Sequence, residues 1–202
     1  MGMIEHVAIG AVPGLPPIDA HDNYWNMPFQ WRQGYVNTKY SVAMHLQPKR
    51  ICEIGVYSGI AALSFLAASP KAEYLGFDSL LEETNRKIVV VQKAKETMRS
   101  LGYKAEVIVE DSQMMTHLPG QFDFVHVDGD HSREGAKHDV LMAWEALTPN
   151  GHILIDNGHD MGVAAGVFDA MYFLVYHKQL VEWRYFEDSV GSILIYKEPF
   201  KR

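Results

Sequence analysis

The chain has 202 residues, 48% of them apolar, and a formal net charge of −7 at pH 7. This length and apolar fraction suit a single folded domain with a full core and argue against disorder. The acidic balance, with no run of Lys or Arg longer than a pair, argues against a nucleic-acid partner or an acidic membrane surface.

The sequence carries no sign of export or of membrane insertion. Its single cysteine, Cys52, lies in an apolar run and cannot form an intrachain disulfide, which fits a reducing compartment. Residues 1–12 lack the basic start and long apolar stretch of a signal peptide. No segment reaches the roughly 18 to 20 apolar residues of a membrane span. We therefore expect a cytoplasmic protein.

The N-terminal part differs in composition from the rest. Residues 11–33 are rich in proline and aromatic residues, which predicts an irregular arm that packs on the domain, folds over its site or mediates a homodimer. Residues 34–46 have a helical pattern that Pro48 ends. We expect one domain over residues 1–202, in which 1–47 form the arm and helix and 48–202 form the core.

From residue 50 onward, strand and helix patterns alternate, and several strands are almost continuously apolar, as parallel strands covered on both faces need to be. The predicted strands are 50–55, 73–78, 105–110, 122–128, 152–156, 180–186 and 192–196, and the predicted helices are 60–68, 81–101, 133–147 and 163–177. The pattern indicates an α/β fold. It predicts a Rossmann-like, doubly wound, mostly parallel seven-stranded sheet with helices on both faces and an antiparallel strand near the C-terminus.

Two acidic strand ends are separated by one helix-sized segment. Asp128 ends the strand 122–128, and Asp156 and Asn157 end the next one. Strands joined in this way are normally parallel neighbours, so their carboxyl ends meet at the edge where open α/β sheets bind ligands. The three side chains would present oxygens that suit a hard cation such as Mg²⁺, Mn²⁺ or Ca²⁺. The alternative is that they only form turns, which Asp and Asn favour.

The first strand runs into the loop Glu53-Ile-Gly55-Val-Tyr57-Ser58-Gly59. Glycines at this point let the backbone turn tightly and approach a ligand. The G-x-G-x-x-G fingerprint is absent, which disfavours a nicotinamide dehydrogenase. Glu53 stands two positions before the first glycine, where it would repel a pyrophosphate but could accept hydrogen bonds from a ligand ammonium group.

The next two strand ends are also acidic. The second strand ends at Asp78, whose carboxylate could accept both hydroxyls of a ribose, and Ser79 follows it. Asp78 could instead only cap the helix that follows. The third strand leads into Asp111, Ser112 and Gln113, which are placed to meet an adenine edge. Sites for an ammonium, a ribose and an adenine, in chain order, describe S-adenosylmethionine (SAM).

These motifs resemble class I SAM-dependent methyltransferases and, within them, the metal-dependent small-molecule O-methyltransferases. Segment 53–59 is close to the SAM loop of catechol O-methyltransferases, and Ser112-Gln113 matches their adenine-side pair. Asp128, Asp156 and Asn157 match their three protein metal ligands. Segment 127–135 is more similar to the macrocin O-methyltransferase group. The resemblance covers roughly residues 48–157.

The resemblance implies a set of cofactor-binding residues at the strand ends. They are Glu53, Gly55, Tyr57, Ser58, Gly59, Asp78, Ser79, Asp111, Ser112, Gln113 and Asp128. It also implies a general base. Catechol O-methyltransferases use a lysine three positions after the first metal aspartate, whereas this chain has His131 there, as the macrocin group does. A histidine suits the role because its imidazole titrates near neutral pH.

The predicted function is therefore SAM- and metal-dependent methyl transfer to a hydroxyl of a small molecule with adjacent oxygens, such as a catechol, a sugar or a natural product. Three alternatives stay open. The first is a metal-independent methyltransferase of the same fold, and the second is a SAM-binding protein without activity. The third is a metal-dependent hydrolase that uses His126, Asp128, Asp130 and His131, although that fold needs a β-sandwich. His126 lies inside a strand, so a core histidine is the expected role.

Overall fold

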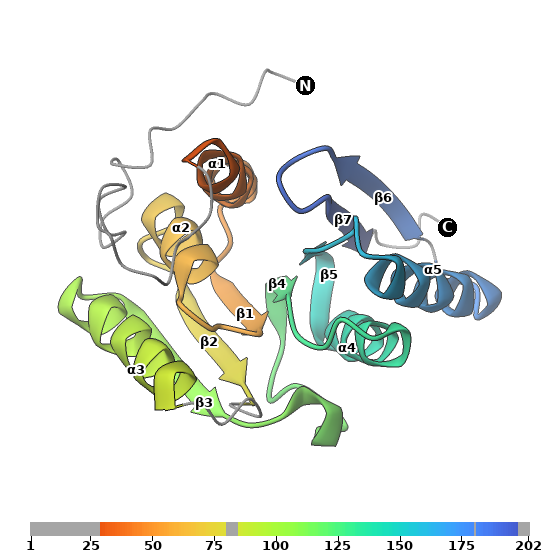
Figure 1. Cartoon of the computed structure of the whole chain (residues 1–202). Coiled ribbons are helices and arrows are strands. Elements are labelled where there is room, and N and C mark those ends of the chain that lie inside the picture. Colours follow the sequence, from red (N-terminus) through yellow and green to blue (C-terminus); the bar gives the residue numbers. More distant parts are fainter. Residues whose placement is uncertain (1–28, 80–84, 180, 198–202) are drawn as a thin grey trace.

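The computed structural model describes residues 29–79, 85–179 and 181–197 (Figure 1). The first part of the predicted arm, residues 11–28, lies outside the described residues. In this part of the chain seven strands form one sheet in the order β3-β2-β1-β4-β5-β7-β6. The strands are β1 (Arg50–Ile54), β2 (Glu73–Asp78), β3 (Lys104–Val109), β4 (Phe122–Val127), β5 (Leu147–Ile155), β6 (Val181–Phe186) and β7 (Ser192–Lys197).

The strand pairing is that of a doubly wound sheet. β1 pairs in parallel with β2 and β4, β2 with β3, and β4 with β5. β7 is antiparallel to both of its neighbours, β5 and β6. The predicted fold class is confirmed, including the antiparallel strand near the C-terminus. Val127 of β4 lies opposite Ile155 of β5, so the two acidic strand ends emerge side by side.

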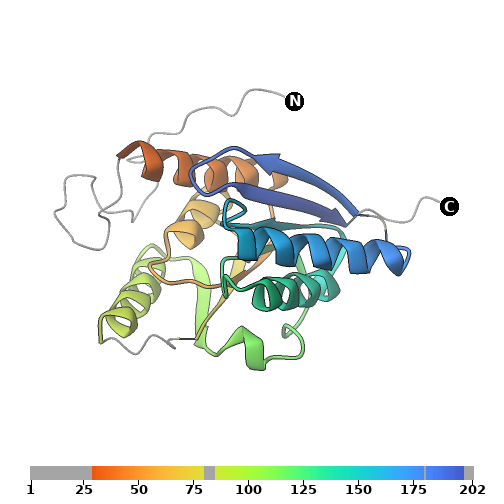
Figure 2. The ribbon, with the colours of Figure 1, turned by 45° about the vertical axis from the view of Figure 1, so that its right-hand side comes forward.

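Helices cover both faces of the sheet (Figures 1 and 2). They are α1 (Phe29–Leu46), α2 (Ile60–Ala68), α3 (Asn85–Ser100), α4 (Arg133–Ala146) and α5 (Met161–Tyr176), with a short 3₁₀ helix at Ser112–Met114. One buried cluster joins α1, α2 and α3 to the sheet and contains Ile51 and Phe124. The other joins α4 and α5 to it and contains Cys52 and Val125. Consecutive residues of β1 and β4 thus face opposite cores, as the period of a strand requires.

Most predicted boundaries agree with the structure to within two residues, but those at the starts of α1 and β5 are wrong by five. Helix α1 begins at Phe29 rather than at residue 34, since residues 29–33 contain no proline or glycine to interrupt a helix after Pro28. β5 begins at Leu147 rather than at 152. The turn-forming sequence at 149–151 stays within the strand because Leu147 pairs with Phe122, and the register then shifts before His152 pairs with Phe124.

A helix that crosses a membrane needs about 20 mostly apolar residues. Within the described ranges, no helix combines the length and the apolar character that crossing a membrane requires.

Candidate active site at the carboxyl edge of the sheet

The loop between β1 and α2 is held from two sides. Gly55 has φ +87°, and a Cβ there would lie 1.9 Å from the carbonyl oxygen of Asp128. Only glycine permits this approach of the loop to the end of β4. At the other side, the backbone N–H of Tyr57 donates to the Asp78 carboxylate at 2.8 Å. Gly59 has φ +73° and precedes the first turn of α2. The predicted SAM loop thus touches the ends of both β2 and β4.

The other predicted residues of this loop region lie at the same edge. Ser58 is half-buried in the loop, and Ser79 is half-buried directly after β2. Asp78 is buried. Its bond to the loop shows that it has a structural role, and its contact with a ribose stays a prediction.

The residues predicted to meet adenine are fixed by one another and by α4. Asp111 accepts the backbone N–H of Gln113 at 3.0 Å and so caps the short 3₁₀ helix. The Gln113 amide donates to the buried Asp139 at 2.9 Å and lies 3.2 Å from the Ser112 hydroxyl. Burial raises the pKa of Asp139. Asp139, which the sequence alone did not point to, therefore positions Gln113, one of the two residues predicted to meet adenine.

Asp128 and His131 form an accessible pair directly after β4. His131 Nε2 lies 3.4 Å from Asp128 Oδ1, and the two side chains are 47% and 26% exposed. The contact with Asp128 raises the pKa of His131, although burial opposes part of this effect. The imidazole is therefore accessible from outside the protein, and its pKa lies above the ordinary value of a histidine.

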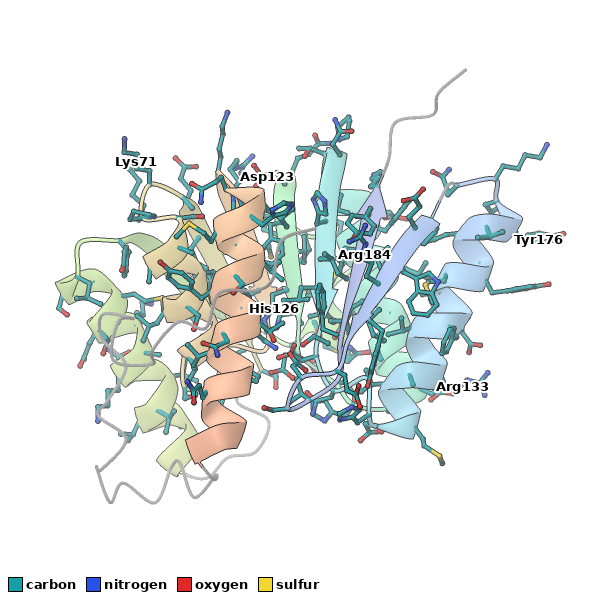
Figure 3. All side chains as sticks on the ribbon, turned by 90° about the horizontal axis from the view of Figure 1, so that it is seen from above. Lys71, Asp123, His126, Arg133, Tyr176 and Arg184 are labelled. Carbon is teal, nitrogen blue, oxygen red and sulfur yellow. The ribbon has the colours of Figure 1, made fainter. Side chains whose placement is uncertain are left out.

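A chain of buried polar contacts runs behind this edge, from β2 through β1 and β4 to β5. The Tyr74 hydroxyl donates to the Glu53 carboxylate. Glu53 Oε1 lies 2.9 Å from His126 Nδ1, and His126 Nε2 lies 3.2 Å from Asp156 Oδ2. The second contact is an ion pair rather than a well-aligned hydrogen bond. His126 is fully buried, as expected of a core histidine. Figure 3 shows it further into the molecule than Asp123, towards a region where several side-chain oxygen atoms lie together.

Glu53 has two protein partners within this chain of contacts. Its carboxylate is 1% exposed, and its two oxygens face Tyr74 and His126. Its predicted contact with a ligand ammonium group stays a prediction.

The chain of contacts ends at Lys39 of α1. Lys39 Nζ donates to Asp156 Oδ1 at 2.5 Å and to the Ser192 hydroxyl at 3.1 Å. It also lies 3.9 Å from Asp188 Oδ2 and 4.0 Å from the centre of the Tyr35 ring. Lys39 is fully buried. An isolated ammonium would be costly at such a position, so these partners are required to keep it there.

The charges alternate along this arrangement. Burial alone would lower the pKa of His126, but Asp156 and Glu53 together raise it to about 10. Burial alone would raise the pKa of Asp156, but Lys39 and His126 hold it well below its usual range. Asp156 is thus a carboxylate that lies between an ammonium and an imidazolium.

The three predicted metal ligands, Asp128, Asp156 and Asn157, lie at the ends of two adjacent strands. Asn157 is half-buried with φ +61°. However, each oxygen of Asp156 faces a cationic side chain. Among the residues that the structure describes, no three His, Cys, Asp or Glu side chains form a group that could hold a metal. The residues present at Asp156 do not fit a divalent cation, because its charge is already balanced.

Several residues of this region were not predicted from the sequence to belong to the site. Lys39, Tyr35, Asp139, Asp188 and Ser192 all contribute contacts to it. For Lys39 a signal was present. It is the only Lys or Arg between residues 33 and 48, and it shares a helix face with Tyr35, Val36, Val42 and Ala43, all buried. A single cation on an apolar helix face predicts a buried partner.

Comparison with known proteins gives the family. The model of a methyltransferase-domain family matches residues 52–158, more than half of the chain. The fold is similar to that of the SAH-bound methyltransferase PaMTH1 of Podospora anserina, with a TM-score of 0.62 and 20% identity over 82% of this chain and 78% of that chain.

Two further structures are similar to the same extent. The O-methyltransferase TomG of Streptomyces achromogenes, involved in tomaymycin synthesis and bound to SAM, has a TM-score of 0.61 and 16% identity over 82% of this chain and 80% of that chain. The SAH complex of a Bacillus cereus O-methyltransferase has a TM-score of 0.63 and 15% identity over 86% and 85%. Among curated proteins, none matches the chain significantly. On the family match and the shared fold, the chain belongs to the methyltransferase-domain family, as the strand-end motifs predicted.

Proposed function

We propose that the chain is an O-methyltransferase that transfers the methyl group of SAM to a hydroxyl of a small molecule. One observation carries the proposal: the glycine loop braced by Asp78 and the accessible Asp128–His131 pair share one edge of the sheet. Membership of the methyltransferase-domain family supports it. So do the SAH or SAM complexes of PaMTH1, TomG and the Bacillus cereus enzyme, which have the same fold.

In this proposal SAM lies across the ends of β1, β2 and β3. The backbone at Gly55 and Gly59 lets the cofactor approach, Asp78 accepts its ribose hydroxyls, and Ser112 and Gln113 meet its adenine. The hydrogen bonds within these segments would preorganise the site, so that little ordering remains when the cofactor binds.

The proposed reaction is a direct displacement. The acceptor oxygen forms a bond to the methyl carbon while the carbon–sulfur bond of SAM breaks, which gives a methyl ether and SAH. His131 takes the proton of the acceptor hydroxyl, and Asp128 orients the imidazole and stabilises the imidazolium that results. Holding the two reactants in line supplies much of the remaining acceleration.

The divalent metal predicted from the sequence is not part of this proposal, because Asp156 is already paired with Lys39 and His126. The requirement for adjacent acceptor oxygens depended on that metal, so the proposal specifies only a hydroxyl. A hydrolase centre finds no support either. His126 is buried, whereas Asp130 is exposed and accepts hydrogen bonds from the backbone and the hydroxyl of Ser132 at 2.8 and 3.0 Å.

Calorimetric titration with SAH tests the cofactor, with NAD as the control. We expect SAH to bind with a stoichiometry of one per chain and NAD not to bind. Incubation with SAM and a panel of phenols, sugars and natural products, followed by mass spectrometry, would then identify the acceptor by the mass gain of one methyl group. Binding of NAD without binding of SAH would overturn the proposal.

A further inference from the structure

We propose that the ammonium of Lys39 takes the place of a divalent cation at Asp156, so that methyl transfer by this chain proceeds without a metal. The inference rests on the proposed function for the reaction itself, but its structural part concerns the cation at Asp156 and can be tested without turnover. Lys39 acts through Asp156 and is a positioning residue, since it is fully buried and cannot touch a substrate.

The first step of the argument is the set of partners around the ammonium. Lys39 Nζ lies 2.5 Å from Asp156 Oδ1 and 3.1 Å from the Ser192 hydroxyl. Asp188 stands 3.9 Å away and is itself fixed, because its Oδ1 accepts the backbone N–H groups of residues 190, 191 and 192. The Tyr35 ring lies against the ammonium at 4.0 Å. These partners form a complete binding site for one monovalent cation that belongs to the protein.

The second step concerns the other oxygen of Asp156. Oδ2 is buried and faces His126 Nε2 at 3.2 Å. A Mg²⁺ ion binds oxygens at about 2.0–2.1 Å in octahedral geometry and usually keeps several waters. Neither oxygen of Asp156 is exposed to admit such waters. A divalent ion at this carboxylate would also stand next to the ammonium of Lys39, and the repulsion between two cations is strong in a buried site.

The third step concerns how the acceptor hydroxyl loses its proton when no metal is present. Without a Lewis acid, the proton of the acceptor must leave to His131 unaided. A phenolic hydroxyl, with a pKa of about 10, is acidic enough for an imidazole base, whereas an alcohol is far less so. A metal-free site also has no use for a second acceptor oxygen. We therefore infer that the acceptor is a phenol and that a neighbouring hydroxyl is not required.

The competing explanation is that Lys39 only ties α1 to the sheet. The two explanations differ in what its removal does to metal binding. If Lys39 stands in the place of a cation, Lys39→Ala leaves Asp156 near Asp128 and Asn157 with one positive charge fewer and with space for an ion. If Lys39 is only a tie, its removal weakens the packing of α1 and creates no metal site.

The experiment measures Mn²⁺ binding by electron paramagnetic resonance on chelator-treated wild-type protein, Lys39→Ala and Lys197→Ala. Lys197 is the control, since it is partly buried and its ammonium, like that of Lys39, has protein acceptors, the carbonyls of Trp144 and Leu147. We expect no bound Mn²⁺ in the wild type or in Lys197→Ala, and one bound Mn²⁺ per chain in Lys39→Ala. A folded Lys39→Ala protein that binds none would overturn the inference.

If Lys39→Ala does not fold, the wild type decides the question. Binding of one Mn²⁺ per chain, together with loss of methyl transfer in EDTA, would overturn the inference. Absence of binding, with turnover of a monophenol unchanged in EDTA, supports it. SAH titration on the same samples separates the two proposals. If the wild-type protein did not bind SAH, the proposed function would be contradicted. The Mn²⁺ spectra test only the role of Lys39.

Discussion

His131 is the residue on which the proposed proton transfer depends. We expect His131→Ala to lower kcat by about 10²–10⁴, the usual contribution of a general base, and to leave SAH affinity unchanged. The reason is position: the His131 side chain contacts Asp128, just after β4, on the side away from Asp78, Ser112 and Gln113, and in our proposal Asp128 orients the imidazole. The measurement is SAH formation under saturating substrate, with calorimetry for affinity. His177→Ala, at the exposed end of α5, is the control.

The dependence of kcat on pH checks the same assignment. The base must be neutral to accept a proton, and Asp128 raises the pKa of His131 above its ordinary value of about 6.5. The acid limb of kcat should therefore lie above that value, and it should move to lower pH in Asp128→Asn. An unchanged kcat in His131→Ala, or an acid limb that survives in it, would exclude this histidine as the base.

The acidic residues at this edge of the sheet could be predicted from the sequence, whereas their cationic partner could not. Asp128, Asp156 and Asn157 could be placed together because their positions follow from the rule for adjacent parallel strands. Lys39 could not be paired with Asp156 in this way. The two are separated by 117 positions, and their contact depends on how α1 packs across the edge of the sheet. The metal site at these residues stays a prediction, and our proposal differs from it by assigning the positive charge at Asp156 to Lys39.

At the scale of elements, the loop between β1 and α2 depends on glycine. We expect Gly55→Ala to destabilise the protein and to abolish SAH binding, because its Cβ would overlap the carbonyl of Asp128. Gly102→Ala is a matched control: Gly102 also has positive φ, but nothing lies within 4 Å of its Cβ position. This control should cost about 1–3 kcal/mol for backbone strain alone and keep SAH affinity. Urea unfolding and calorimetry give the two quantities.

Equal losses of stability in the two variants, with SAH affinity retained in both, would contradict this account. In that case the close approach of the loop to β4 would matter neither for the fold nor for the cofactor.

Element boundaries were predicted best where local sequence decides them. The limits of α2 and β2 agree with the prediction to the residue, since an apolar run with clear flanking turns defines each one. β5 was predicted too short because its first half is stabilised by pairing rather than by propensity. Its turn-forming residues 149–151 are accommodated by the shift of register opposite β4, which local sequence does not report.

At the scale of the whole molecule, the buried polar contacts connect six elements that are far apart in the chain, beginning with Tyr74 of β2. Glu53, His126 and Asp156 belong to or follow three adjacent strands, and Lys39 brings in α1, while Ser192 brings in β7. Removing one partner of such a network leaves a buried charge without its counter-charge, which typically costs about 3–5 kcal/mol. The network therefore stabilises the fold and holds the ends of β1, β4 and β5 in one arrangement.

The charge on His126 makes a prediction about stability and pH. Its pKa is about 10 in the folded protein and about 6.5 in an unfolded chain, so the folded state binds the proton more tightly. This stabilisation is fully present below pH 6.5 and is lost as pH rises towards 10. Relative to His126→Gln, the wild type should lose on the order of 1 kcal/mol of unfolding free energy per pH unit across this window. Urea unfolding at several pH values measures it.

His152→Gln is a control of opposite sign. Burial lowers the pKa of His152, so protonation favours the unfolded chain, and the wild type should lose stability relative to this variant only as pH falls below about 6.5. Above that value the two curves should run parallel. If the curves for the wild type and His126→Gln also ran parallel from pH 6.5 to 10, the buried imidazole would be neutral. Lys39 would then be the only cation that balances Asp156, and its removal would be correspondingly more damaging.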